Sequence, residues 1–203
     1  MSALHAAVVL AAGSSRRLGR PKQLLTRDGE ALVHRVARLA LESGASRVLV
    51  IIGARADDMR AAVADLPVEC VVNPAWSSGM AGSVRVAAET LATHAGATFL
   101  LACDQPALEA THLRGLREAA QRADAGSAAT RFGDRLGIPA LVSPAMLRQA
   151  RTLPDGDRGL RDVLSATDAG VAACDAPGLE HDIDTPDDVA VAVAKGWLDP
   201  VGA

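Results

Sequence analysis

The stretch VVLAAGSSRRLGRPK, residues 8–22, joins the end of a short apolar segment to a loop of small residues. The apolar segment, 6–10, predicts a β-strand, and the loop after it contains Gly13 and Gly19. Four cations lie in or directly after the loop: Arg16, Arg17, Arg20 and Lys22. Glycines at a strand tip let backbone N–H groups approach a ligand closely, and Arg and Lys side chains neutralise phosphate oxygens. The stretch therefore predicts a strand that opens into a site for a nucleoside triphosphate.

The spacing of the glycines differs from the two common phosphate-binding patterns. A dinucleotide-binding loop has G-x-G-x-x-G and a P-loop has G-x-x-x-x-G-K-[ST]. Here five residues separate Gly13 from Gly19, and Lys22 comes three positions after Gly19. The alternative is an ordinary surface loop, in which the glycines only turn the chain and the cations are solvated.

Strand-like and helix-like segments alternate through the first half of the chain. Apolar runs predict strands over 47–53, 68–72 and 98–102, and helical periodicity predicts helices over 31–43, 55–66 and 82–93. This alternation is typical of a parallel sheet with right-handed crossovers. Because such sheets bind ligands beyond the carboxyl ends of their strands, we expect Gly13 and Asp104 at the same edge.

The second half predicts two strands, 127–131 and 138–142, whose short spacing indicates an antiparallel edge on the sheet. A short helix is expected over 144–151, a last strand over 171–174, and a helix that begins at Pro186. The expected fold is α/β: a Rossmann-like, mostly parallel sheet with helices on both faces and an antiparallel edge. No linker interrupts the pattern, so we expect a single domain over 1–203.

Composition narrows the classes of partner. The chain has 203 residues, 49% of them hydrophobic, and a formal net charge of -3, with no basic face beyond 16–22. We therefore expect no nucleic-acid partner. No signal-peptide pattern and no apolar run near the roughly 20 residues that span a bilayer occur, so a soluble, cytoplasmic protein without a membrane partner is expected. Three widely spaced cysteines and five scattered histidines match no zinc spacing, and we expect no transition metal.

Acidic residues supply the candidate metal ligands. Asp104 follows a buried strand, in the segment CDQP, where a carboxylate can hold Mg²⁺ together with water and substrate phosphates. Helix capping is the alternative role for Asp104. Asp182 and Asp184 lie in DIDTP, and we expect Asp184 as a second metal ligand or as a helix cap. DIDTP also resembles the nucleophile motif of haloacid-dehalogenase-type phosphatases, but too little chain follows it for that fold.

Several segments together carry a family resemblance. AAGSSRRLGRPK resembles the signature L-A-A-G-x-S-x-R-x-G-x-x-K of MobA-like nucleotidyltransferases, which have a nucleotide-diphospho-sugar transferase-like fold. Further segments are similar, in the same order, to motifs of molybdenum-cofactor cytidylyltransferases: NPAWSSGMAGS (73–83), CDQP (103–106), GIPALVSP (137–144), GDRGLRDVL (156–164) and DIDTPDD (182–188). Two positions depart from the pattern, since the cytidylyl subgroup often has proline at Leu10 and alanine at Leu160.

The resemblance implies transfer of CMP from CTP to the phosphate of the molybdopterin cofactor, with release of pyrophosphate and a requirement for Mg²⁺. It implies that Lys22 and Arg17 hold the triphosphate and that Asp104, with Asp184, binds the metal. The nucleotide would contact Leu10, Ala11, Ala12, Gly13, Ser15, Lys22, Gly79 and Ser83. Met80 is expected at the nucleotide or the pterin, Trp76 as a stacking or packing residue, and Arg131, Arg158 and Arg161 at the cofactor phosphate, at an acidic partner or in solvent.

Alternatives stay open on the sequence. Relatives that use GTP carry glycine where Ala12 stands, so the alanine favours CTP. A GTP-dependent enzyme, or one acting on a sugar or alditol phosphate, would share the same loop and metal site. A noncatalytic molybdenum-cofactor carrier would bind the pterin without turning over CTP. A client molybdoenzyme is a further possible partner, which no residue identifies.

Overall fold

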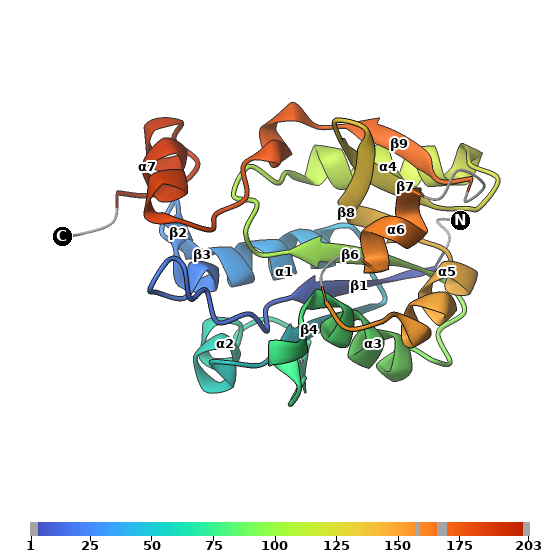
Figure 1. Cartoon of the computed structure of the whole chain (residues 1–203), viewed down its shortest axis with the longest axis horizontal. Helices are drawn as coiled ribbons and strands as arrows, with labels where there is room; N and C mark the ends of the chain where they lie inside the picture. The colour runs from blue at the N-terminus through green and yellow to red at the C-terminus, as the bar shows by residue number, and fades with distance from the viewer. Residues whose placement is uncertain (1–3, 157–158, 166–169, 201–203) are drawn as a thin grey trace.

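The computed structural model describes residues 4–156, 159–165 and 170–200. Its centre is a seven-stranded sheet in the order β5-β4-β1-β6-β8-β7-β9 (Figure 1). The strands are β1 (His5–Leu10), β4 (Arg47–Ile52), β5 (Glu69–Val72), β6 (Ala97–Ala102), β7 (Ala128–Phe132), β8 (Arg135–Val142) and β9 (Ala172–Asp175). The predicted fold class is confirmed, since β1 pairs in parallel with both β4 and β6.

The antiparallel part of the sheet does not lie at its edge. β8 is antiparallel to β6 on one side and to β7 on the other, and it therefore lies inside the sheet. β9 pairs in parallel with β7 and forms the edge instead. The predicted antiparallel pairing is therefore present on this side of the sheet, and a strand from late in the chain, β9, adds outside the β7–β8 hairpin.

Helices cover both faces of the sheet (Figure 1). One face packs on α1 (Leu32–Glu42), α2 (Ala56–Ala62) and α4 (Ala110–Arg122), and the other on α3 (Met80–Thr90), α5 (Pro144–Gln149) and α6 (Gly159–Ser165). Successive residues of β1 alternate between the two cores, with Ala7 and Val9 in one and Ala6 and Val8 in the other. Strands that are apolar on both faces thus fit a sheet buried on both faces.

A small third cluster lies at one end of the molecule, where α7 (Pro186–Ala194) lies beside a short hairpin of β2 (Thr26–Arg27) and β3 (Glu30–Ala31) (Figure 1). Its buried residues come from both ends of the chain: Leu18, Leu25, Leu32, Ile183, Val189, Ala192 and Leu198. Thr185 caps α7 in a capping box with Asp188, as its position before Pro186 predicts. This cluster holds the segment before α7 against the loop after β1.

Among residues 4–156, 159–165 and 170–200, no helix has the length and apolar character needed to cross a bilayer.

Candidate active site

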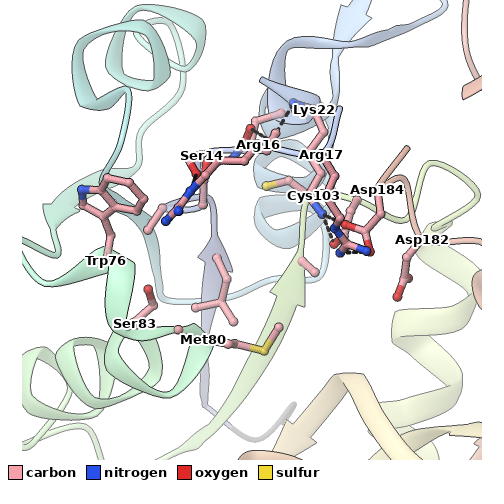
Figure 2. Close-up of a pocket in the computed structure, with 18 of the residues that line it drawn as sticks. Ser14, Arg16, Arg17, Lys22, Trp76, Met80, Ser83, Cys103, Asp182 and Asp184 are labelled. Carbon is pink, nitrogen blue, oxygen red and sulfur yellow. Dashed lines mark hydrogen bonds and ion pairs between the residues drawn. The ribbon is translucent and has the colours of Figure 1, made fainter. Parts of the chain in front are cut away.

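A cavity of about 600 Å³ opens beyond the carboxyl ends of β1 and β6. Figure 2 shows Lys22, Arg17 and Asp184 gathered on one side of it, and Trp76, Ser83 and Met80 on the opposite side. The sequence predicts eleven residues for nucleotide, catalytic or metal roles. Ten of them line the cavity: Leu10, Ala12, Gly13, Ser15, Arg17, Lys22, Gly79, Ser83, Asp104 and Asp184. Parallel-sheet topology thus brings together residues spread over most of the chain.

Ala11 is the predicted contact residue that does not line the cavity. It is buried, its N–H donates to the carbonyl of Ile51, and its own carbonyl accepts from the Gln23 side chain. Both backbone groups of Ala11 are therefore used inside the protein. Ala11 therefore anchors the start of the loop to β4 and to Gln23.

Lys22 forms the centre of a small ionic network. Its Nζ lies 2.7 Å from Asp104 Oδ2 and 2.9 Å from Asp184 Oδ1, and its side chain is only 16% exposed. Arg17 Nη2 lies 2.8 Å from the other oxygen of Asp184. Two carboxylates and two cations from three separate parts of the chain therefore meet at one wall of the cavity.

The surroundings raise the pKa of two groups at this wall, Lys22 and Asp182. Burial lowers the pKa of Lys22, but Asp104 and Asp184 outweigh this effect, so the pKa is raised above its ordinary value. Asp182 also faces the cavity, where burial and the negative charge of Asp104 raise its pKa to about 7. Lys22 is therefore charged at neutral pH, and Asp182 is partly protonated there.

Cys103 also lines the cavity at this wall, and a cysteine thiol can act as a nucleophile. Burial, reinforced by the charge of neighbouring Asp104, raises the pKa of the Cys103 thiol well above its ordinary value. The side chain is 3% exposed. A protonated, buried thiol is a poor nucleophile, so the geometry favours chemistry that needs no covalent intermediate on cysteine.

The position of Asp184 depends on the third cluster. Ile183 is fully buried in that cluster, and its N–H donates to the carbonyl of Asp104 at 2.8 Å. The backbone N–H of Asp184 donates to Asp188 Oδ2, a residue in the first turn of α7. These contacts fix the carboxylate of Asp184 beside Lys22. Asp184 therefore does not itself cap α7, which Thr185 does.

The opposite wall belongs to the segment that leads into α3. Gly79 has a φ of +101°, a conformation that favours glycine, and it starts the helix at Met80, two residues before the predicted start. The N–H of Ala81 donates to the carbonyl of Gly156, so at that position the helix N-terminus is already occupied. Trp76 lines the cavity and packs over Gly53, where an added Cβ would lie 2.6 Å from the Trp76 Cβ.

A second cavity, of about 540 Å³, adjoins the first and shares Met80, Ala102, Asp104, Arg161 and Asp182 with it. Its other lining residues include an apolar group from the β7–β8 hairpin and α6: Phe132, Leu136, Ile138, Leu160 and Leu164. Arg135 adds a cation to this cavity, and Arg161 lies between the two spaces. The sequence analysis did not predict the apolar group, because the hairpin and α6 come together only in the folded chain.

The sequence predicts the same roles for two other arginines, Arg131 and Arg158, as for Arg161. Arg131 lines neither of the two adjoining cavities and pairs with Asp175, with 3.1 Å between Arg131 Nε and Asp175 Oδ1. Its predicted role at a cofactor phosphate therefore finds no support, because β9 supplies a carboxylate beside it. Arg158 lies outside the described residues.

The fit of a divalent cation can be judged from the donor set. Among the residues that the structure describes, no three His, Cys, Asp or Glu side chains are grouped closely enough to hold a metal on their own. Asp104 and Asp184 nevertheless bracket one cationic group, the Lys22 ammonium. Mg²⁺ usually takes one or two protein carboxylates and completes its shell with water and substrate phosphates, so these two residues fit it.

The chain is similar to a known protein family and to several known proteins. The family described as "MobA-like NTP transferase domain" matches residues 7–171. The chain is 35% identical to a nicotine blue oxidoreductase of Paenarthrobacter nicotinovorans, over 81% of this chain and 76% of that protein. It is 33% identical to a probable molybdenum cofactor guanylyltransferase of Opitutus terrae, over 79% and 78% respectively.

Among solved structures, Rv0371c of Mycobacterium tuberculosis H37Rv has a TM-score of 0.80 and 28% identity, covering 96% of this chain and 100% of that one. A structure of Rv0371c in complex with manganese has a TM-score of 0.77 and 26% identity, covering 94% of this chain and 98% of that one. The match over 7–171 spans most of the chain, including the glycine loop and Asp104. The chain therefore belongs to the family of MobA-like NTP transferase domains.

Proposed function

We propose that this protein transfers CMP from CTP to the phosphate of the molybdenum cofactor and releases pyrophosphate. The observation that carries the proposal is the Lys22 ammonium, held between Asp104 and Asp184 in a cavity that the glycine loop borders. A cavity of about 600 Å³ lies within the range of small-molecule sites. Cations, carboxylates and a glycine loop at one strand edge suit a nucleoside triphosphate.

Phosphoryl chemistry of this kind needs positioning and charge neutralisation more than covalent help from the protein. An oxygen of the acceptor phosphate forms a bond to the α-phosphorus of CTP, and the bond from that phosphorus to the pyrophosphate breaks. Lys22 and Arg17 would bind the triphosphate and stabilise the charge of the departing pyrophosphate. The attacking phosphate oxygen is already anionic, so no general base is required.

Asp104 and Asp184 would hold the divalent cation, with Mg²⁺ as the expected ion. When bound, Mg²⁺ would neutralise charge on the triphosphate and on both carboxylates. Lys22 and Arg17 would then exchange their carboxylate partners for phosphate oxygens. The manganese complex of Rv0371c supports a divalent-cation site in a protein of this shape.

The second cavity is the proposed acceptor site. Phe132, Leu136 and Ile138 offer apolar surface for a flat ring, and Arg161 lies where the two cavities meet. An acceptor that carries a ring system and a terminal phosphate would place the ring on this surface and the phosphate near Arg161. A sugar or alditol phosphate lacks a ring that would use the apolar wall, which makes it the weaker candidate.

The base preference rests on Ala12. Alanine at this position favours CTP in the family pattern, whereas the Opitutus terrae relative is named a guanylyltransferase, which makes GTP the main alternative. The relative named nicotine blue oxidoreductase brings in a redox activity as a further alternative, because a phosphate-binding loop also suits a dinucleotide.

The test incubates purified protein with Mg²⁺, molybdenum cofactor and either CTP or GTP, and measures pyrophosphate release. Turnover with CTP and little with GTP is the expected result, and the reverse would assign GTP. Pterin binding without turnover would favour a cofactor carrier, and a client molybdoenzyme would then be sought. Oxidation of NADH or NADPH with a quinoid dye, without pyrophosphate release, would favour the redox alternative.

A further inference from the structure

Gln23, the residue after Lys22, lies beneath the glycine loop and is 3% exposed. Its side-chain nitrogen donates to two loop carbonyls, that of Gly13 at 2.7 Å and that of Ala11 at 3.1 Å. Its side-chain oxygen accepts from the hydroxyl of Ser15 at 3.3 Å. A single buried amide therefore bonds three residues of the loop.

These bonds decide which polar groups the loop offers to a ligand. The carbonyls of Ala11 and Gly13 point to Gln23, and that of Ala12 accepts from the N–H of Ala54 at 3.1 Å. Within the part of the chain that the structure describes, the N–H groups of residues 12–14 have no protein acceptor. The loop thus uses the carbonyls of Ala11, Ala12 and Gly13 inside the protein, whereas the N–H groups of residues 12–14, which line the cavity, remain available to a ligand.

Ser15 links this arrangement to the phosphate side of the site. It has a φ of +52°, which a residue with a side chain rarely adopts. Its hydroxyl accepts from the backbone N–H of Lys22 at 3.1 Å while donating to Gln23. The loop and the segment that carries the cation are therefore held in one fixed relation, which compensates for the cost of the unusual backbone.

We infer that Gln23 is a positioning residue that makes this loop select ligand atoms that accept hydrogen bonds. This inference rests on the proposed function and deepens it. Cytosine presents two adjacent acceptors, O2 and N3, which neighbouring loop N–H groups can bind. The Watson–Crick edge of guanine presents one acceptor, O6, beside the N1–H and N2–H donors, and these two donors need the carbonyls that Gln23 turns inward. Gln23, which itself lines the cavity, thereby contributes to a preference for CTP over GTP by fixing the carbonyls of the loop.

The test compares binding of CTP and GTP, measured by titration calorimetry, in Gln23→Glu, Gln23→Met and the unchanged protein. Glutamate has the size of glutamine but repels the two carbonyls, and methionine has a similar length without polar atoms. We expect CTP binding to weaken about tenfold or more and GTP binding by less than about threefold, as when buried partners are lost. Both ligands carry the same triphosphate, so a general loosening of the loop would weaken both equally.

Gln121→Glu is the matched control, because Gln121 is exposed near the C-terminal end of α4, away from the cavity. Thermal denaturation of each variant separates loss of selectivity from loss of the fold, and Gln23→Met serves if Gln23→Glu does not fold. Equal weakening of CTP and GTP, or no change in either, would overturn the role of Gln23. Failure of the unchanged protein to bind CTP better than GTP would overturn the proposed base and this inference with it.

Discussion

The ammonium of Lys22 lies 2.7 Å from the carboxylate of Asp104, although 82 positions separate the two residues in the chain. Both side chains are more than four-fifths buried, at 16% and 18% exposure. An ion pair in such a place costs desolvation energy that simple packing would avoid, and removing one partner leaves a buried, uncompensated charge. Its position at the cavity wall points to a role in ligand chemistry.

Asp104→Asn should remove metal-dependent turnover, by about a hundredfold or more, because the amide supplies no negative charge to a divalent cation. The free energy of unfolding should fall by a smaller factor than turnover, because Lys22 keeps Asp184 as an ion-pair partner and the Asp104 carbonyl still accepts from Ile183. Pyrophosphate release and thermal denaturation measure the two effects. A folded variant with normal turnover would show that Asp104 is not a metal ligand.

Lys22→Met should strengthen binding of Mn²⁺ in the absence of nucleotide, because the ammonium now neutralises Asp104 and Asp184. The same change should weaken CTP binding, through loss of a phosphate contact. Calorimetric titration with Mn²⁺ alone, and then with CTP, measures both. Lys195→Met, at an exposed position just after the C-terminal end of α7, where the ammonium contacts His181 and Trp197 and does not line the cavity, is the control. Weaker Mn²⁺ binding in Lys22→Met would contradict the idea that the ammonium stands in for the metal.

Arg161→Ala should raise the KM for the phosphate-bearing acceptor about tenfold, with a smaller effect on the KM for CTP, because Arg161 lies where the two cavities meet. Steady-state kinetics with each substrate varied in turn gives both constants. Arg148→Ala, exposed on α5, should leave both unchanged. An effect confined to CTP would move Arg161 to the nucleotide side of the site.

The free energy of unfolding should fall at low pH, because Glu30 becomes protonated. Hydrogen bonds from Arg38, joined by one from His34, lower the pKa of Glu30 from an ordinary 4.5 to about 2. A lowered carboxyl pKa contributes stability above pH 4.5 that is lost as the pH falls towards 2, here about 1 kcal/mol because water screens the pair. Glu30→Gln should flatten this part of the stability profile in denaturant unfolding from pH 5 to pH 2.5, whereas Glu118→Gln, at an exposed position on α4, should not. Parallel profiles for Glu30→Gln and the unchanged protein would contradict this account.

Ile183→Ala should couple stability to activity. The side chain is fully buried in the cluster beneath α7, so its loss should cost about 2–5 kcal/mol of unfolding free energy. Turnover should fall further than the folded fraction predicts, because Asp184 follows Ile183 directly. Val191→Ala, 43% exposed on the same helix, is the control for α7 and should change neither quantity by much. Full activity in folded Ile183→Ala would show that Asp184 does not depend on this cluster for its position.

The parallel core could be predicted because its strands are apolar on both faces. Strands β1, β4 and β6 agree with the expected ranges within one or two residues. The place of β9 at the edge of the sheet could not be predicted, since it depends on the pairing of β9 with β7, a contact between segments 44 positions apart at Ala128 and Ala172. The β2–β3 hairpin has two residues in each strand, too few to carry a pattern.

Some residues of the candidate site could likewise be predicted from the sequence, and others could not. Lys22 and Asp104 could be predicted because each follows a recognisable strand end, and topology places those ends together. The role of Gln23 could not be predicted, because its side chain donates to backbone carbonyls, and a sequence pattern does not show which side chain will bind a given backbone group. The apolar wall of the second cavity was missed because Phe132 and Leu160 meet only when α6 packs beside the β7–β8 hairpin.

The last carboxylate of the site comes from beyond the segment that the family match covers, which ends at residue 171. Lys22 and Asp184 are 162 positions apart, so during synthesis on the ribosome the glycine loop and Asp104 emerge long before the segment that carries Asp184. Until α7 has left the ribosome and packed on the hairpin of β2 and β3, the nascent chain holds Lys22 with one carboxylate instead of two. The ion pairs around Lys22 therefore depend on a segment that the ribosome makes long after the glycine loop, and they are incomplete until Asp184 has been made and placed.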